Sequence, residues 1–224
     1  MKISIKKKKL DLNLLLSLLT KPVSLFISFI TIPISLNYLG QEIYGLWITI
    51  FGVVSWINFF DFGLGHGLRN RLSEALAFEE IEKVKLIIQT GYSSVIIIAT
   101  LLFLISLPII NYVDWVSLMN TNIISNNTFV SLFIFTTLYV FISFVLNLIK
   151  PIYYAFELPQ FVGFLSIVQQ LFFLFGILYL TENTNTSILD FCHTYGLSMI
   201  ASALILSILF FFKNKPIFPK KISL

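Results

Sequence analysis

The chain has 224 residues, of which 57% are hydrophobic and only 12% carry a charged side chain. Soluble domains have about a quarter of their residues charged, and a chain this apolar would expose larger hydrophobic patches in water than soluble monomers tolerate. The formal net charge is +4, but the basic residues lie in short clusters between apolar runs, a pattern that indicates membrane topology and not nucleic-acid binding.

Six apolar stretches are long enough to cross a bilayer as helices, which takes about 20 residues each. They cover residues 17–38, 43–65, 86–110, 128–149, 160–180 and 188–212. Runs such as residues 94–107 do not alternate as the strands of a membrane barrel do, and helices satisfy their own backbone hydrogen bonds in lipid. We therefore expect an all-α integral membrane protein, a single membrane domain over residues 1–224 that forms a bundle of six transmembrane helices.

The loop lysines and arginines predict how this bundle is oriented. They precede the first expected helix, lie in the second and fourth connections, and follow the last helix: Lys2, Lys6, Lys7, Lys8, Lys9, Arg69, Arg71, Lys83, Lys85, Lys150, Lys213, Lys215, Lys220 and Lys221. The alternate connections, residues 39–42, 111–127 and 181–187, contain neither residue type. The positive-inside rule then places both termini in the cytoplasm.

Three charged residues fall within the expected membrane helices, namely Lys21, Asp61 and Asp190, and the first two lie nearer the cytoplasmic side. Lys21 lies about one turn into the first helix, where its ammonium either snorkels to the cytoplasmic interface or lines an aqueous vestibule for an anionic substrate. Asp61 lies one to two turns from the cytoplasmic end of the second helix. A carboxylate at that depth needs a cation, water or a proton.

Residues 69–85 are polar on one side and apolar on the other, which predicts a short amphipathic cytoplasmic helix along the membrane interface. Glu79 and Lys83 have the spacing of an ion pair on such a helix. Arg69 and Arg71 would bind either membrane lipid with an anionic head group or a phosphate-bearing substrate.

A polar stripe is expected on the fifth helix. Gly163, Ser166 and Gln170 share one face, and Gln169 is rotated away from it. Hydrogen bonds between helices account for such a stripe in a membrane. The stripe therefore predicts a packing face.

The sequence offers no set of residues that converges on catalysis. His66 and His193 are the two histidines, and the topology places them at opposite membrane faces, which excludes a site built from both. Asp190 lies one turn before His193, as in a proton relay, but Ser187-x-x-Asp190 has the form of a helix cap. We expect no enzymatic activity, no metal and no cofactor.

Two motifs resemble a known family. Residues 39–47, LGQEIYGLW, and residues 60–71, FDFGLGHGLRNR, are similar to the first two helices of the polysaccharide flippases. These O-antigen and repeat-unit translocases belong to the multidrug/oligosaccharidyl-lipid/polysaccharide exporter superfamily. The later helices match only in number and character. Family members have about twelve helices in two six-helix lobes, so the chain resembles the N-terminal half only.

The resemblance implies translocation of a polyprenyl-diphosphate-linked oligosaccharide across the bacterial inner membrane for the export of O-antigen, lipopolysaccharide or capsule. The chain would then be one half of a transporter, with a second lobe or a homodimer as its partner. The substrate-binding residues would be Lys21, Asp61, Arg69 and Arg71. The three cations would bind the diphosphate, and Asp61 is the first candidate if transport is coupled to a proton or sodium gradient. The alternative is a non-transporting structural or partner subunit, or a truncated remnant of a membrane complex.

Overall fold

The computed structural model describes residues 2–61, 63–183 and 185–214, with the side chains of residues 2–17 and 59–61 outside the description. The described residues form helices and no strand, which confirms the all-α prediction. The elements are α1 (Lys2–Leu39), α2 (Gln41–Ser55), the 3-10 helix η1 (Trp56–Asp61), α3 (Leu64–Ala77), α4 (Ile81–Tyr112), α5 (Trp115–Met119), α6 (Asn126–Leu146), α7 (Ile149–Ala155), α8 (Pro159–Asn183) and α9 (Ile188–Lys213).

Five segments in the described part of the chain are long and apolar enough to cross a membrane, so the protein is a multi-pass membrane protein. They are Leu18–Leu39, Ile81–Tyr112, Asn126–Ala155, Pro159–Asn183 and Ile188–Lys213. The second of the six predicted spans, residues 43–65, is not a single helix. It is divided among α2, η1 and the start of α3, and the 15 residues of α2 rise only about 22 Å, less than the roughly 30 Å hydrocarbon core.

Local interactions explain why this second helix breaks. The Asn58 side-chain amide donates a hydrogen bond of 2.8 Å to the carbonyl of Ser55, the last residue of α2. Such a bond offers the backbone an alternative to the regular helical ladder. Gly63 then adopts a left-handed conformation with φ of 76°, which costs glycine little. The chain therefore enters α3 in a new direction.

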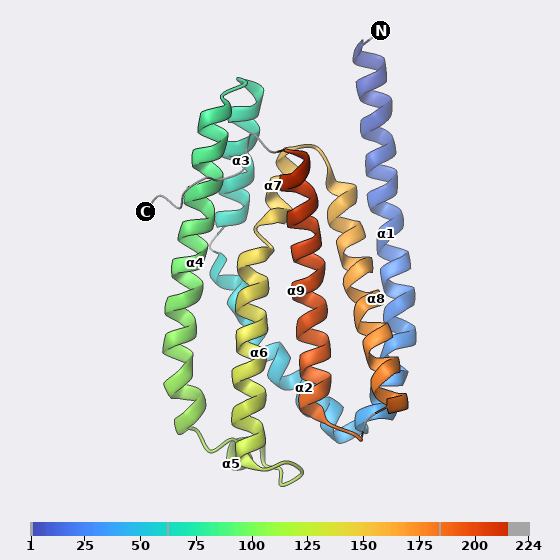
Figure 1. Ribbon diagram of the computed structural model, residues 1–224, viewed down its shortest axis with the longest axis vertical. Coiled ribbons are helices and arrows are strands. Elements are labelled where there is room, and N and C mark those ends of the chain that lie inside the picture. The colour runs from blue at the N-terminus through green and yellow to red at the C-terminus, as the bar shows by residue number, and fades with distance from the viewer. Residues whose placement is uncertain (1, 62, 184, 215–224) are drawn as a thin grey trace.

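The long helices run side by side, and the connections gather at two ends of the bundle (Figure 1). The start of α1, the α3–α4 turn, α7 and the last turn of α9 lie toward one end, and α5 and the α8–α9 connection lie at the other. The lysines and arginines with described side chains lie on elements at the first end or next to them: Arg69 and Arg71 on α3, Lys83 and Lys85 at the start of α4, Lys150 on α7, Lys213 at the end of α9, and Lys21 on α1, which lines one cavity with Tyr154 of α7. We call this first end the basic end.

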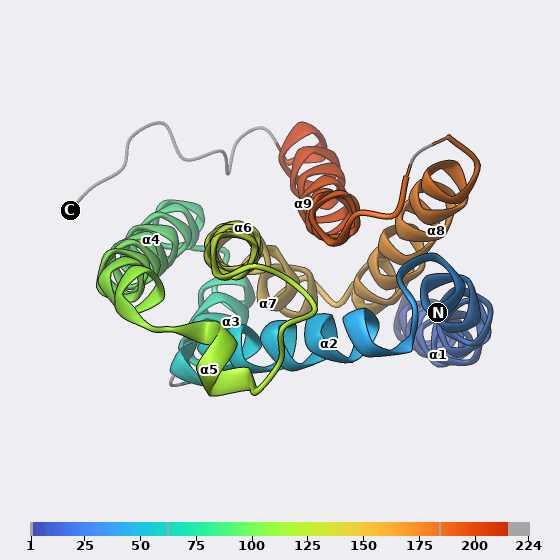
Figure 2. The ribbon, with the colours of Figure 1, turned by 90° about the horizontal axis from the view of Figure 1, so that it is seen from below.

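Viewed along the bundle, the long helices follow a curved row in the order α4, α6, α9, α8 and α1, and α2 crosses one side of this row (Figure 2). α1 packs chiefly on α8. In turn, α8 packs on α9, and α6 packs on both α9 and α4. α1 is therefore the edge of the row. Many of its apolar side chains are exposed, including Phe26 and Phe29, as expected for a helix that faces lipid.

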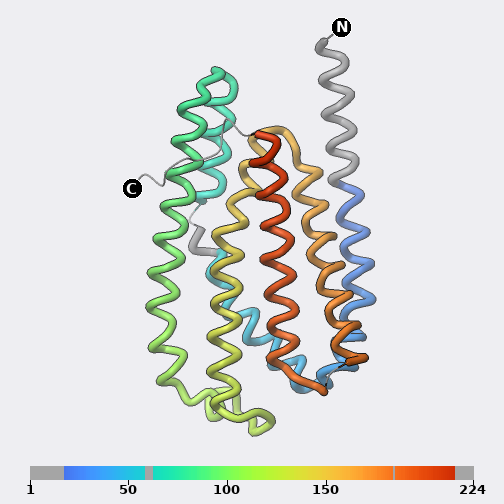
Figure 3. Tube along the Cα trace, in the orientation of Figure 1, coloured from blue at the N-terminus to red at the C-terminus, as the bar shows by residue number. Residues whose placement is uncertain are grey.

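The amphipathic helix predicted over residues 69–85 is not continuous. α3 ends at Ala77 and α4 begins at Ile81, so this segment is a helical hairpin at the basic end (Figure 3). Glu79 occupies the turn with φ of 57°, and Lys83 pairs at 2.8 Å with Glu80 instead of Glu79. The apolar face of α3 packs against α4 and α7, which gives it a protein partner in place of the membrane interface.

Candidate functional site

One face of α1 carries a continuous polar stripe. Lys21, Ser24, Ser28, Thr31 and Ser35 recur every three or four residues, so they lie on the same side of the helix. This face borders α8, the helix on which α1 chiefly packs. The spacing was present in the sequence as a signal, but sequence analysis singled out only Lys21 from this stripe.

α8 supplies the opposite wall. At Gly163 the two helices come close enough that an added Cβ would meet the side chain of Thr20. Further along, the Gln170 amide donates a hydrogen bond of 2.6 Å to the Ser24 hydroxyl. Gln169 is predicted to be rotated away from the polar stripe of α8 itself, but it borders the same cavity as Gln170. Two consecutive residues of α8, Gln169 and Gln170, therefore both lie in the wall of this cavity.

Two adjoining cavities lie between α1 and α8, with volumes of about 370 and 350 Å³. Both have Ser24 and Ser166 in their walls, and together we call them the α1–α8 cleft. The first, which we call the Lys21 cavity, is also lined by Thr20, Lys21, Tyr154 and Gly163. The second, the glutamine cavity, is also lined by Ser28, Thr31, Ser35, Tyr44, Phe173, Gln169, Gln170 and Tyr195.

Lys21 is the one charged side chain among the described residues that line the cleft. Lys21 is exposed, and no carboxylate from the described side chains borders either cavity. Lys21 also forms no ion pair within the described part of the chain. An ammonium without a counter-charge in a membrane-spanning helix is costly and marks a place where an anion is attracted.

Tyr154 connects a second cation with the Lys21 cavity. This side chain, on α7, lines the cavity, and the guanidinium carbon of Arg69 lies 5.6 Å from the centroid of its ring. That distance is within the range of a cation–π interaction. The structure therefore brings α1, α7 and α3 together at the part of the cleft nearest the basic end.

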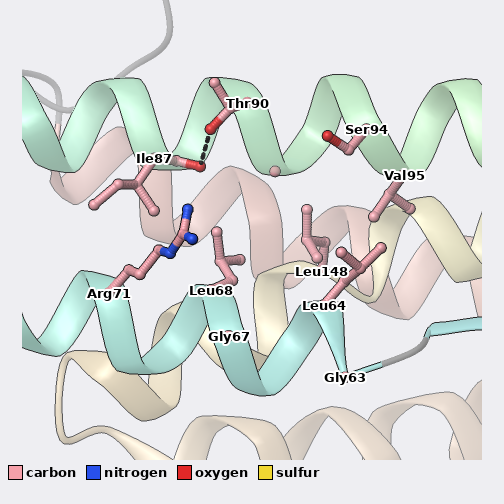
Figure 4. Close-up of a pocket in the computed structure, with 11 residues that line it drawn as sticks. Gly63, Leu64, Gly67, Leu68, Arg71, Ile87, Thr90, Ser94, Val95 and Leu148 are labelled. Carbon is pink, nitrogen blue, oxygen red and sulfur yellow. Dashed lines mark hydrogen bonds between the residues drawn. The ribbon is translucent and has the colours of Figure 1, made fainter.

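Arg71 lies elsewhere. It lines a separate cavity of about 310 Å³ between α3 and α4. Figure 4 shows its guanidinium directed toward α4, near Thr90, whose hydroxyl donates to the Ile87 carbonyl at 3.1 Å. Two positions along an α-helix correspond to a rotation of about 200°. The expected grouping of Lys21, Arg69 and Arg71 is therefore divided, with Arg71 in a different cavity.

The fourth predicted site residue, Asp61, is the last residue of η1. Its side chain lies outside the described side chains, so its role stays a prediction.

At the other end of the bundle, the Asp190 backbone N–H donates to the Ser187 hydroxyl at 3.2 Å, which confirms the predicted helix cap. His193 is 2.8 Å from the Tyr139 hydroxyl.

Comparison with known proteins gives one partial match. A segment of 118 residues is 34% identical to a protein of Yersinia pseudotuberculosis described as "Putative O-antigen export protein". The match covers 51% of this chain and 27% of the relative, so the chain spans about a quarter of that protein's length. No protein-family model and no solved structure matches the chain. The similarity suggests a polysaccharide export family.

Proposed function

We propose that this chain is part of a transporter in the bacterial inner membrane, and that the transporter flips a polyprenyl-diphosphate-linked oligosaccharide for export of surface polysaccharide. The α1–α8 cleft is the observation that carries the proposal, because it combines Lys21, which forms no ion pair with any described side chain, with a long polar lining between membrane-spanning helices. The partial similarity to a protein named for O-antigen export supports the choice of substrate class.

In this mechanism, the Lys21 ammonium binds the diphosphate. Charge-assisted hydrogen bonds to phosphate are stronger than neutral ones, and the attraction increases where lipid and protein replace water. Arg69, held over the Tyr154 ring, adds positive potential near the same cavity. The polyprenyl tail remains in lipid beside the exposed apolar side chains of α1, such as Phe26 and Phe29, because α1 lies at the edge of the helix row.

The proposed transporter has a second body, which is either another lobe or a second copy of this chain. Alternating access requires one bundle to rock against another around a fixed binding site. The cleft lies between α1 and α8, the two helices at one end of the row in Figure 2, and in this proposal the second bundle packs against that end. Asp61 is retained in the proposal as the residue that couples transport to a proton or sodium gradient.

The proposal is tested by changing the charge of the cleft in cells that contain the complete transporter. Lys21→Gln should lower substrate affinity by about tenfold, which corresponds to 1.4 kcal/mol, because a charge-assisted hydrogen bond to phosphate is stronger than a neutral one, and glycan export should fall accordingly. Lys21→Arg keeps the charge and should retain most export. Lys213→Gln, at the end of α9 and outside the cleft, is the matched control.

Export is measured as polysaccharide at the cell surface, with the amount of the chain in the membrane determined in parallel. Normal export by Lys21→Gln at an equal protein level would refute the proposed role of the cleft and favour a non-transporting structural subunit. Equal loss with Lys21→Gln and Lys213→Gln would show that the effect is not specific to the cleft.

A further inference from the structure

We infer that the glutamine cavity is a separate subsite that binds the uncharged sugars of the substrate, an inference that rests on the proposed function. It differs in chemistry from the Lys21 cavity, since no charged side chain from the described residues lines it. Its walls are hydroxyl, amide and aromatic groups from α1, α2, α8 and α9. Such a lining does not select anions but suits a neutral ligand with many hydroxyl groups.

Three polar side chains in this cavity have no hydrogen-bond partner within the described part of the chain. Gln169, Ser28 and Ser166 form no hydrogen bond with any described residue, although all three line the cavity and belong to membrane-spanning segments. A polar group in a membrane that has no partner is unfavourable, and it is normally satisfied by a neighbouring helix, water or a ligand. The Gln169 amide thus has two N–H donors and one carbonyl acceptor available to a ligand in the cavity.

The neighbouring glutamine supports the same conclusion. Gln170 uses its amide nitrogen to bind the Ser24 hydroxyl at 2.6 Å, while its Oε1 atom is buried and has no hydrogen-bond partner. A buried acceptor without a donor is destabilising. Gln160 Oε1, which borders neither cavity, shares this feature, and Gln170 differs from it because its side chain lines the cavity. A ligand hydroxyl that reached Oε1 from the cavity would supply the missing donor.

Aromatic rings complete the cavity. Tyr44, Phe173 and Tyr195 line it, and the Phe173 and Tyr195 rings hold each other in an edge-to-face contact at 4.9 Å. A tyrosine offers an apolar ring together with a hydroxyl. A sugar ring has the complementary character, with C–H bonds on its faces and hydroxyls around its edge. Amides and aromatic rings in one cavity therefore match a glycan better than an acyl chain.

The position of this cavity fits a substrate in which sugar is joined to diphosphate. Ser28 lies seven residues after Lys21 on α1, a distance of about 10 Å along the helix axis. The two cavities adjoin at Ser24 and Ser166. A lipid-linked oligosaccharide with its diphosphate at Lys21 therefore places its first sugars in the glutamine cavity.

The experiment compares two ligands that share the polyprenyl diphosphate and differ in the sugar and in one ionisable oxygen of the terminal phosphate, so the effect of each variant is compared lipid by lipid. The protein is purified in lipid nanodiscs, together with any partner that accompanies it, and its binding to two lipids is measured. One is polyprenyl diphosphate without sugar, and the other is the lipid-linked oligosaccharide extracted from the same cells. We expect the unaltered chain to bind the glycosylated lipid about tenfold more tightly, the ratio that 1.4 kcal/mol corresponds to. Gln169→Leu should remove this preference and leave binding of the bare lipid unchanged.

Gln160→Leu is the matched control, because Gln160 lies on the same helix and borders neither cavity. Ser28→Ala, a smaller change in the same cavity, should reduce the preference in the same direction and provides the test if Gln169→Leu does not fold. An unchanged preference in the folded cavity variants, or an equal loss for both lipids, would overturn the inference. Failure of the unaltered chain to bind either lipid would instead overturn the proposed function.

Discussion

Arg69 and Arg71 lie two positions apart on α3, and Arg69 faces α7 whereas Arg71 faces α4. The Arg69 guanidinium lies 5.6 Å from the centre of the Tyr154 ring on α7, whereas Arg71 lines a cavity against α4. A phosphate group bound in the α1–α8 cleft is thus near Arg69 and not Arg71. The two arginines, which belong to one sequence motif, should therefore respond differently to substitution.

The Arg69–Tyr154 contact should be measurable as a coupling free energy. In a double-mutant cycle with Arg69→Gln and Tyr154→Leu, we expect a coupling of about 0.5–1 kcal/mol, the usual value for a cation–π pair that is partly exposed. The free energy of unfolding is measured by denaturant titration in detergent. The same cycle with Arg71→Gln and Tyr154→Leu should be additive within about 0.5 kcal/mol, as for residues without a shared contact. Equal coupling in the two cycles would contradict the orientation of α3.

Close packing at Gly163 should be essential to the cleft. Gly163→Ala places a Cβ 3.0 Å from Cβ of Thr20 and closer still to its hydroxyl. Forcing such a group into a packed contact costs about 1–3 kcal/mol, and we expect that loss of stability in a denaturant titration. Thr20→Ala should restore part of it by removing the crowded hydroxyl and methyl groups.

Gly52→Ala provides the comparison, because a Cβ at Gly52 meets no atom within 4 Å. Alanine is also the better helix former by about 0.5–1 kcal/mol. The Gly52 variant should therefore be as stable as the unaltered chain or slightly more so. If Gly163→Ala behaves in the same way, α1 and α8 do not approach each other as described.

The basic end should face the cytoplasm. Cys192 is fully buried, so a Cys192→Ser background allows single cysteines to be introduced at Ser73 on α3 and at Asn122 after α5, both of which are exposed. In cells with a permeabilised outer membrane, a maleimide reagent that does not cross the inner membrane should label Asn122→Cys. It should label Ser73→Cys only after lysis. The reverse pattern would invert the orientation that the positive-inside rule predicts.

The sequence determined that most of this protein lies in a lipid bilayer, and it determined the order of the long helices. Apolar runs of about 20 residues leave few solutions other than membrane helices, and the structure has long apolar helices over residues 81–112, 159–183 and 188–213. The second helix was predicted as continuous because periodicity does not register a local break. The Asn58 side-chain bond to Ser55 and the left-handed Gly63 depend on backbone geometry that hydropathy does not contain.

The candidate site was visible in the sequence only as separate residues. Lys21 and Gln170 were recognisable as polar positions in apolar helices, and the regular spacing of Ser24 and Ser28 was present beside them. Only tertiary structure decided that α1 packs along α8, which turns these positions toward one another, and that Arg69 and Arg71 separate. The physical reason is that helix periodicity specifies which residues share a face, whereas the packing of all the helices specifies what that face meets.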